Sequence, residues 1–262
     1  MISTRRQFLA HLGAVGLGLV LNPSLGSVAR AEEFSGVLTR PDHLVLETVE
    51  ASGLAHYSYF VGDKIGKVAM VIDPRRDIEV YLELARKHGM TITHVLDTHI
   101  HADFLSGARE LAARVKTAKI CASVEGDPEY GYPIDLKLRH GDIVGQGALR
   151  LQALHTPGHT PEHMSFVALG SESGGSPWAL FTGDFLFVGS VGRPDLMGVE
   201  NTERLAKALY STVKTGYSGL PDGISIYPAH GPGSPCGAGI QKATGRPTLG
   251  RERAANPYLN LD

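Results

Sequence analysis

Short apolar runs recur along the chain and predict β-strands that alternate with single helices. Three such runs, separated by glycine-containing turns, lie at residues 44–49, 56–61 and 67–72. Residues 78–88 place most of their apolar side chains on one helical face and are followed by Gly89, so they predict a helix. A strand at residues 91–96 and a helix at residues 107–115 are expected next.

The same alternation continues through the second half of the chain. Strands are predicted at residues 118–123, 148–154, 164–169, 178–182 and 224–227, and a helix at residues 202–212. The sequence SESGGSP at residues 171–177 is typical of a hairpin-like loop. Strands that alternate with helices indicate an α/β fold, and we find no short internal repeat.

Composition and charge narrow the classes of ligand. With 262 residues, 42% of them hydrophobic, the chain is long enough for one large core. A formal net charge of −2 with interspersed signs provides no basic stripe for nucleic acid or for an anionic membrane. The 32 glycines and 15 prolines gather around histidines and aspartates, which favours a site carried on loops. We therefore expect a small-molecule ligand.

The first 31 residues have the pattern of an export signal. Arg5 and Arg6 precede Gln-Phe-Leu and a glycine-rich apolar run, and Ala29 and Ala31 are placed as small residues before a cleavage position. The apolar run is about half of the roughly 20 residues that a membrane-spanning helix needs. The segment resembles a twin-arginine signal, which implies export of a folded protein to the periplasm. We expect a signal peptide at 1–31 and a catalytic domain at 32–262, with no membrane attachment after cleavage.

The chain has two cysteines, and we do not expect them to form a disulfide. Cys121 lies in a predicted strand, where a buried, unreactive thiol is the simpler interpretation. Cys236 lies in a loop rich in glycine and proline. It is either a reactive thiol or a small loop residue without a chemical role, depending on its local charge and exposure.

Residues that can bind a metal ion cluster after predicted strands. His99, His101 and Asp103 alternate in THIHADFLSG, so in an extended chain their side chains would point the same way. Three further residues of this kind also follow strands, namely His159, Asp184 and His230. Any single histidine is more simply explained as part of an exposed turn, but the group indicates a metal site. Without a thiolate among them, zinc, iron or manganese is favoured over a structural zinc site.

Two members of this group have simpler explanations that the sequence leaves open. His159 follows Pro157-Gly158, and a Pro-Gly pair is often only a turn. Asp184 follows Gly183 at the end of an apolar run, where an aspartate can cap a following helix. As a metal ligand it would instead be a buried carboxylate, which is costly to bury without a cation.

Four motifs then indicate a family. THIHAD at residues 98–103, HTPGHT at 155–160, FTGD at 181–184 and PAHG at 228–231 occur in this order over nearly all of the mature chain. The set resembles the metallo-β-lactamase superfamily. That resemblance implies a single-domain αββα sandwich with the metal site at one edge, between the two sheets.

Phe104 bears on the number of metal ions. Two-metal hydrolases of this superfamily, such as glyoxalase II, have a histidine directly after the aspartate of THxHxD, and it helps to hold the second ion. Phe104 occupies this position here and cannot bind a metal. The resemblance then implies one ion per chain.

Further segments narrow the resemblance to the persulfide dioxygenase branch, especially bacterial members in which such a domain precedes rhodanese domains. These segments are HADFLSG, FLFVGSVGRPDL at residues 185–196 and GSPCG. The resemblance implies that His99, His159 and Asp184 hold one Fe(II). Two histidines and a carboxylate leave positions open for a persulfide and O2, which would yield sulfite.

The remaining candidate residues would support the reaction. His101, Asp103 and His230 would orient ligands or water around the iron. Arg193 would hold a substrate carboxylate or the developing sulfite, or else form a surface ion pair with Asp195. By the resemblance, Cys236 would accept or position sulfane sulfur.

The thiol carrier, the partners and the oligomeric state stay open. Gly231 and Pro232 stand where members that act on glutathione persulfide have Asp-Tyr, so the carrier is glutathione or another thiol. No rhodanese domain follows, so a separate sulfurtransferase is the expected partner unless the chain belongs to a longer fusion. A homodimer is compatible with the sequence.

Two alternative functions are compatible with the same residues. The first is a Zn(II)-dependent hydrolase of thioesters or lactones, in which a metal-bound hydroxide attacks the substrate. The second belongs to another class: a non-catalytic periplasmic protein that binds persulfide or metal.

Overall fold

Two β-sheets face each other in the computed structural model, which describes residues 38–170 and 175–261. The expected signal peptide at residues 1–31 and part of the predicted loop, residues 171–174, lie outside the described residues. All described residues belong to one compact unit. Among them, no helix is both long enough and apolar enough to cross a membrane.

The first sheet has six strands in chain order. They are β1 (Leu44–Ala51), β2 (His56–Asp63), β3 (Val68–Ile72), β4 (Thr91–Leu96), β5 (Lys119–Ser123) and β6 (Leu136–Leu138). Strands β1 to β3 are antiparallel, with the short helix η1 (Ser52–Leu54) between β1 and β2, whereas β3 to β6 are parallel. The parallel pairs β3–β4 and β4–β5 are connected by α2 (Glu79–His88) and α3 (Ala108–Arg114).

The second sheet has the strand order β13-β10-β9-β8-β7. Its strands are β7 (Ile143–Gln146), β8 (Leu149–His155), β9 (Met164–Leu169), β10 (Pro177–Gly183) and β13 (Ser225–Pro228). All pairs are antiparallel except β10 and β13, which are connected through the small ribbon of β11 (Leu186–Phe187) and β12 (Ser190–Val191) and through α4 (Val199–Thr215). Helix α5 (Leu249–Ala255) follows β13.

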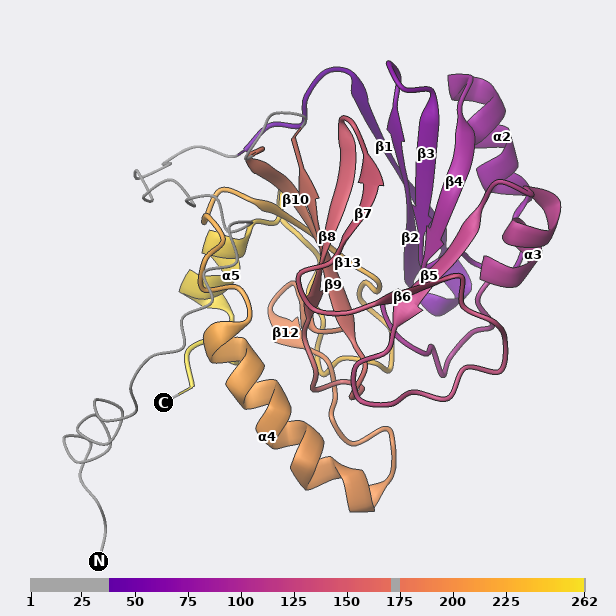
Figure 1. Cartoon of the computed structure of the whole chain (residues 1–262). Coiled ribbons are helices and arrows are strands. Elements are labelled where there is room, and N and C mark those ends of the chain that lie inside the picture. The colour runs from indigo at the N-terminus through magenta and orange to yellow at the C-terminus, as the bar shows by residue number, and fades with distance from the viewer. Residues whose placement is uncertain (1–37, 171–174, 262) are drawn as a thin grey trace, which may run out of the picture. The chain divides into compact units, whose positions relative to one another are not determined.

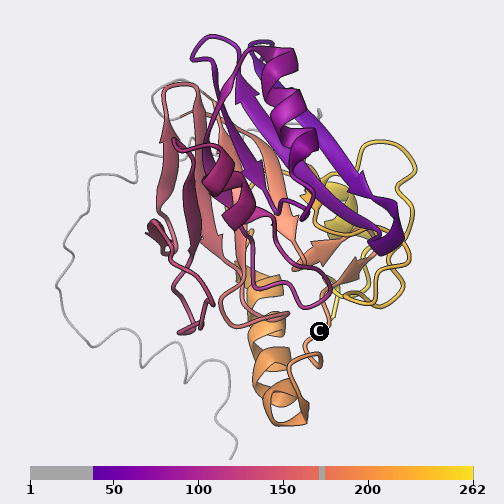
Figure 2. The same cartoon turned by 90° about the vertical axis from the view of Figure 1, so that its right-hand side faces the viewer.

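Helices cover the outer face of each sheet. Figure 1 shows α2 and α3 beside the first sheet and α4 and α5 on the opposite side, and in Figure 2 α2 and α3 face the viewer in front of the first sheet. Side chains alternate accordingly. Phe60 packs in the cluster under α2 and α3, and its neighbour Val61 packs between the sheets. In β9, Phe166 faces the first sheet and Val167 packs toward α4 and α5. The expected αββα sandwich is confirmed.

Local sequence explains where the helices begin and end. Helix α2 buries Tyr81 and Ala85 on one face and ends at Gly89, whose φ of 63° is the left-handed conformation that favours glycine. Helix α4 buries Leu205, Leu209 and Thr212 and begins three residues before its predicted start. Its first residue, Val199, is 90% exposed, so this turn does not belong to the apolar pattern.

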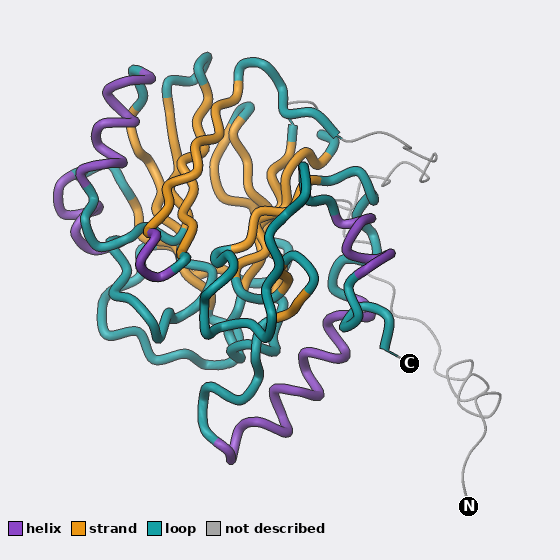
Figure 3. Tube along the Cα trace, turned by 180° about the vertical axis from the view of Figure 1, so that it is seen from behind, coloured by secondary structure: helices purple, strands orange, loops and turns teal. Residues whose placement is uncertain are grey.

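The longer loops gather at one end of the two sheets (Figure 3). The segment after β4 lies beside the start of β9, because the Met164 N–H donates to the Thr98 carbonyl at 2.7 Å. The segment after β13 lies beside β10, because the Ala229 N–H donates to the Gly183 carbonyl at 3.0 Å. The strand ends that carry the candidate ligands are therefore neighbours in space.

Candidate metal centre

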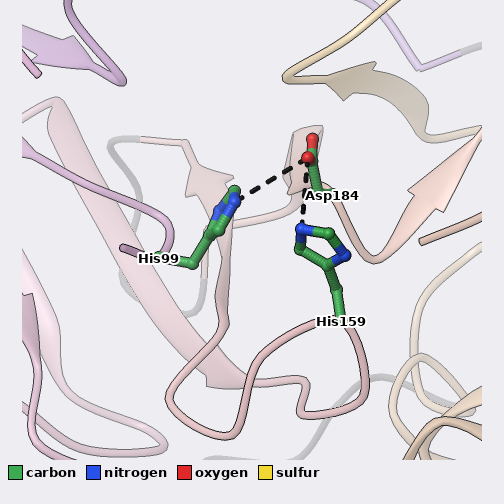
Figure 4. A group of neighbouring side chains, drawn as sticks. All are labelled: His99, His159 and Asp184. Carbon is green, nitrogen blue, oxygen red and sulfur yellow. Dashed lines mark ion pairs between the residues drawn. The ribbon is translucent and has the colours of Figure 1, made fainter. Parts of the chain in front are cut away.

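His99, His159 and Asp184 come together at this end of the sandwich (Figure 4). They follow β4, β8 and β10, and their side chains are at most 5% exposed. Asp184 Oδ2 lies 3.7 Å from His99 Nε2 and 3.5 Å from His159 Nε2. These separations exceed those of hydrogen bonds, and Asp184 Oδ2 is buried without a hydrogen-bond partner among the described residues.

The second nitrogen of each histidine fixes its tautomer. His99 Nδ1 lies 2.9 Å from Thr98 Oγ1, which donates its own hydrogen to Asp73 Oδ2, so His99 Nδ1–H is the donor. His159 Nδ1–H donates to the Arg193 carbonyl at 2.9 Å. Both Nε2 lone pairs are therefore free and face Asp184. Burial, followed by the charges of neighbouring histidines, also lowers the pKa of His99 well below its usual value, which keeps the ring neutral.

This arrangement fits a metal ion. Donor atoms that each lie about 2.1 Å from one ion are about 3–3.7 Å apart, as the nitrogens of His99 and His159 are from Asp184 Oδ2. An ion there would also satisfy the otherwise unpartnered carboxylate oxygen. Two imidazoles and one carboxylate, each oriented by another hydrogen bond, form the ligand set that we would assign to this ion.

His230 links this cluster to Asp103. Its Nδ1–H donates to Asp184 Oδ1 at 2.7 Å, and its Nε2 lies 2.9 Å from Asp103 Oδ2 without hydrogen-bond geometry. Burial alone would lower the pKa of His230, but the charges of Asp184 and Asp103 raise it to about 10. Burial would raise the pKa of Asp184, but His230 lowers it, so the Asp184 carboxylate is ionised.

His101 lies beside His99, with ring centroids 4.1 Å apart, but it does not belong to the group of three ligands. Its Nε2 lies 3.0 Å from Asp73 Oδ1, and Asp73 also accepts from the Thr98 N–H at 2.7 Å. Residues 100–107 form bends and irregular backbone and not a strand, so the alternation of an extended chain does not fix where the side chains of His101 and Asp103 point. His99, His101 and Asp103 consequently belong to three different groups of neighbouring side chains.

Phe104 packs against two of these histidines. Its ring centroid lies 4.0 Å from that of His56 and 4.3 Å from that of His101. Burial, followed by the charge of His101, lowers the pKa of His56 to about 4. In place of a nitrogen donor, an apolar ring therefore fills the space beside the two imidazoles.

Cys236 lies near Asp103 and His230, and one ligand atom from each of the three lies within 4.8 Å of the others. Cys236 and His230 are buried, whereas Asp103 is partly exposed. Burial, followed by the charge of Asp184, raises the pKa of the Cys236 thiol far above its usual value. Cys121 is also buried, and both thiols are free. Asp103, His230 and Cys236 therefore form a second group of possible metal ligands. This group contains a sulfur donor, whereas Phe104 cannot contribute a nitrogen donor to it.

Arg193 lies at the exposed edge of the metal centre and forms an ion pair with Asp195. Its Nε and Nη2 donate to the two carboxylate oxygens of Asp195 at 3.0 and 2.6 Å, and both side chains are more than one-third exposed. The Arg193 carbonyl orients His159, so this residue connects to the centre through its backbone. Gly192 precedes it, and a Cβ there would lie 1.9 Å from the Asp184 carbonyl oxygen. Only glycine fits this close approach.

Three buried polar residues of this region were missed in the sequence. Asp73 ends β3 much as Asp184 ends β10, and this strand-end position could have identified it. His163 follows HTPGHT by three residues and contacts Asp184. His56 begins β2 and forms an isolated β-bridge with His230, a long-range contact that no local pattern indicates.

His230 also lines a cavity of about 520 Å³ beside the centre. The cavity lies along β1, β2 and β13 and under the loop that follows His230, and its wall includes Tyr57, Tyr59 and Tyr227. Lys242 and Arg246 lie at its exposed side, and neither forms an ion pair with a described residue. The cavity therefore combines an aromatic wall with two available cations. Its volume is typical of small-molecule sites.

The αββα fold and a buried group of side chains that could hold a metal ion indicate a metal-binding class of protein, and comparison with known proteins identifies the family. The family model described as the metallo-beta-lactamase superfamily matches residues 51–230. This match spans more than half of the chain and ends at His230. The chain therefore belongs to the metallo-beta-lactamase superfamily.

Three similar proteins show the range within this family. The mitochondrial persulfide dioxygenase ETHE1 of Mus musculus is 32% identical over 78% of this chain and 72% of its own length. The hydroxyacylglutathione hydrolase of Dictyostelium discoideum is 31% identical over 67% of this chain and 62% of its own length. A metallo-beta-lactamase structure from Staphylococcus aureus is 37% identical, with a TM-score of 0.76 over 84% of this chain and 64% of that one.

Proposed function

We propose that this protein is an iron-dependent persulfide dioxygenase. The observation that carries the proposal is the group of His99, His159 and Asp184, whereas the Nε2 of the neighbouring His101 is bound to Asp73. Two histidines and one carboxylate on one side of an ion, with the other positions open, are typical of non-haem Fe(II) oxygenases. The likeness to a persulfide dioxygenase supports the same assignment.

The proposed reaction balances without a further reductant. A persulfide, O2 and water give a thiol, sulfite and two protons. The S–S bond breaks, the sulfane sulfur loses four electrons, dioxygen takes them up, and the carrier sulfur leaves as the thiol. Fe(II) held by the three ligands would supply the redox chemistry, because its open positions admit sulfur and dioxygen side by side.

The protein's own residues would keep the centre in this form. His230 occupies Asp184 Oδ1 and leaves Oδ2 free, so the carboxylate would bind through one oxygen. Phe104 and His56 fill the adjacent space and exclude water from that side. Arg193 would hold an anionic product at the rim. Exchanging its exposed partner Asp195 for such an anion costs little, because exposed ion pairs contribute only about 0–1 kcal/mol.

The cavity beside His230 suggests the chemistry of the thiol carrier. Its tyrosines would pack against an organic chain, and Lys242 and Arg246 would attract carboxylate or phosphate groups. We propose that the carrier is an elongated thiol with anionic groups, glutathione being one example. Gly231 and Pro232 at the same cavity leave no side-chain hydroxyl or carboxylate at those two positions.

A zinc hydrolase of thioesters or lactones is the second candidate, and two observations favour it. One relative is a hydroxyacylglutathione hydrolase. In addition, Asp103 and His230 have buried atoms without hydrogen-bond partners among the described residues, and Cys236 lies beside them. Those three residues would hold a second ion despite Phe104.

The proposals on location and partners rest on the sequence alone. We propose export to the periplasm through the signal at residues 1–31, a separate sulfurtransferase as supplier of persulfide, and no nucleic-acid partner.

Oxygen uptake with a persulfide substrate tests the assignment. Protein exported in its native host and purified without chelators should contain about one iron per chain and consume one O2 for each sulfite formed. Stoichiometric zinc with thioester hydrolysis and no O2 uptake would establish the hydrolase instead. Tight metal binding without turnover of either substrate would instead support a non-catalytic metal-binding protein.

A further inference from the structure

His163 is a buried histidine that contacts the metal centre without belonging to its ligands. It lies directly before β9 and is fully buried. Its Nε2 accepts the backbone N–H of Asp184 at 2.9 Å, and its Nδ1 lies 2.9 Å from Thr156 Oγ1. Its ring also stacks on that of His99, with centroids 5.2 Å apart and an interplanar angle of 30°. One side chain thus touches two of the three candidate ligands.

The hydrogen bonds of His163 allow one tautomer. The Asp184 amide can only donate, so His163 Nε2 must carry the lone pair and Nδ1 must carry the proton. Nδ1–H then donates to Thr156 Oγ1, and the Thr156 hydroxyl has its own hydrogen left for Ser165 Oγ at 2.9 Å. Because both ring nitrogens are used, His163 cannot bind the ion itself.

The chain of hydrogen bonds returns to the same turn. Ser165 Oγ–H donates to the Thr182 carbonyl at 3.4 Å, and the Tyr217 hydroxyl donates to Ser165 Oγ at 2.6 Å. The turn that carries Asp184 is therefore held at two points, through the Thr182 carbonyl and through the Asp184 amide. Buried networks in which every member is satisfied make a structure rigid.

Gly183 allows this close approach. Its φ is +53°, and a Cβ at this position would lie 2.4 Å from His163 Nε2. The backbone before Asp184 consequently rests directly against the imidazole, with no side chain between them.

We propose that His163 is a positioning residue, which sets the direction of the Asp184 carboxylate through its backbone and the plane of the His99 ring through stacking. The inference rests on the metal centre of the proposed function but not on persulfide as substrate. Residues that orient metal ligands typically change metal affinity by about 10–100-fold when they are replaced.

Binding of Co(II) to the metal-free full chain tests the proposal without any substrate. Visible absorption reports the ligand geometry, and competition with a chelator gives the affinity. In His163→Leu, we expect a changed Co(II) spectrum and an affinity at least about 10-fold weaker. In His163→Gln, the amide oxygen can accept from the Asp184 N–H where Nε2 does, but the stacking on His99 is lost, so affinity should fall between those of the wild type and the Leu variant.

Two further variants keep the test decisive. Val167→Ala truncates a buried side chain of β9, the strand that follows His163, and this side chain packs toward α4 and α5. The variant should therefore lower thermal stability and leave the Co(II) spectrum unchanged. Thr156→Val removes the acceptor of Nδ1–H and should shift the spectrum in the same direction as His163→Leu. A wild-type spectrum and affinity in His163→Leu would overturn the proposal, as would equal losses in the Gln and Leu variants. If His163→Leu does not fold, wild-type Co(II) binding in Thr156→Val would overturn it.

Discussion

His230 Nδ1 lies 2.7 Å from Asp184 Oδ1, and this contact decides which oxygen of Asp184 is free. The other oxygen, Oδ2, faces the Nε2 atoms of His99 and His159. His230 thus acts on the candidate ligand set from outside it. Its remaining nitrogen lies beside Asp103, which places the imidazole between two carboxylates.

Replacing His230 should therefore weaken metal binding although His230 is not one of the three ligands. In His230→Ala, Asp184 loses the hydrogen bond that orients it, and we expect metal affinity to fall by about 10–100-fold. Metal content after dialysis against graded chelator measures this. His94→Ala is the matched control, because His94 is half-buried in β4 and hydrogen-bonds to Thr93. Equal metal retention in the two variants would contradict the role given to His230.

Phe104→His should raise the metal content from about one ion per chain toward two. The new imidazole would join Asp103 and His230, whose buried atoms lack hydrogen-bond partners among the described residues. Phe104→Leu, which removes the ring without adding a donor, should stay at about one ion. Elemental analysis of both variants decides the matter. Two ions in the wild type would contradict the role given to Phe104.

Neither cysteine should react readily in the folded protein. Burial raises the pKa of the Cys121 thiol to about 12, from 9.0. The thiolate is the reactive form, so at pH 8 its fraction falls by about a thousandfold. Burial also raises the pKa of Cys236. We expect slow alkylation of both thiols by iodoacetamide in the native state and rapid alkylation in urea, followed by mass spectrometry. Fast native alkylation of Cys236 alone would restore it as a reactive thiol.

The sequence predicts the fold more completely than the site. Every predicted strand and helix outside the undescribed segments is present, with ends shifted by up to three residues, because each buries a clear apolar face. Strands β6, β7, β11 and β12 and helix α5 were missed, since they are short and bury few apolar side chains. For example, α5 buries only Leu249 and Glu252.

Within the site, the sequence indicates which residues gather but not how they pair. His99, His159 and Asp184 each follow a strand, and parallel or neighbouring strands bring their ends together. The partner of His101 Nε2 is Asp73, which lies 28 residues before His101 and reaches it only because β3 and β4 are adjacent. No spacing within THIHADFLSG contains that information.

Stability at acidic pH should depend in part on Glu47. Its carboxylate accepts from Lys87 and His88, each at 2.8 Å, and these bonds lower its pKa below 4.5 in the folded state although partial burial opposes them. A lowered folded-state pKa gives stability that is present above pH 4.5 and is lost as the pH falls through the folded-state value. For a pair this exposed, the contribution is about 0.2–1 kcal/mol.

Thermal melts of Glu47→Gln measure this contribution. At pH 7 the variant should melt about 1–3 °C below the wild type, and the two should converge near pH 3. Glu203→Gln is the control, because Glu203 and its partner Lys207 are 82% and 74% exposed and should contribute less. A difference for Glu47→Gln that persists at pH 3 would point to packing instead of charge.

The cavity beside His230 should determine which persulfides are used. Lys242 and Arg246 form no ion pair with a described residue, so they are available to an anionic carrier at the aromatic wall. In Lys242→Ala/Arg246→Ala, KM for a carboxylate-bearing persulfide should rise by about tenfold, as expected for the loss of two exposed charge contacts of about 0.2–1 kcal/mol each. The value of kcat should change little, since neither residue touches the three ligands. An alkyl persulfide whose carrier has no carboxylate serves as the matched substrate and should show an unchanged KM. An equal rise for both substrates, or a fall in kcat alone, would mean that the cavity does not hold the carrier.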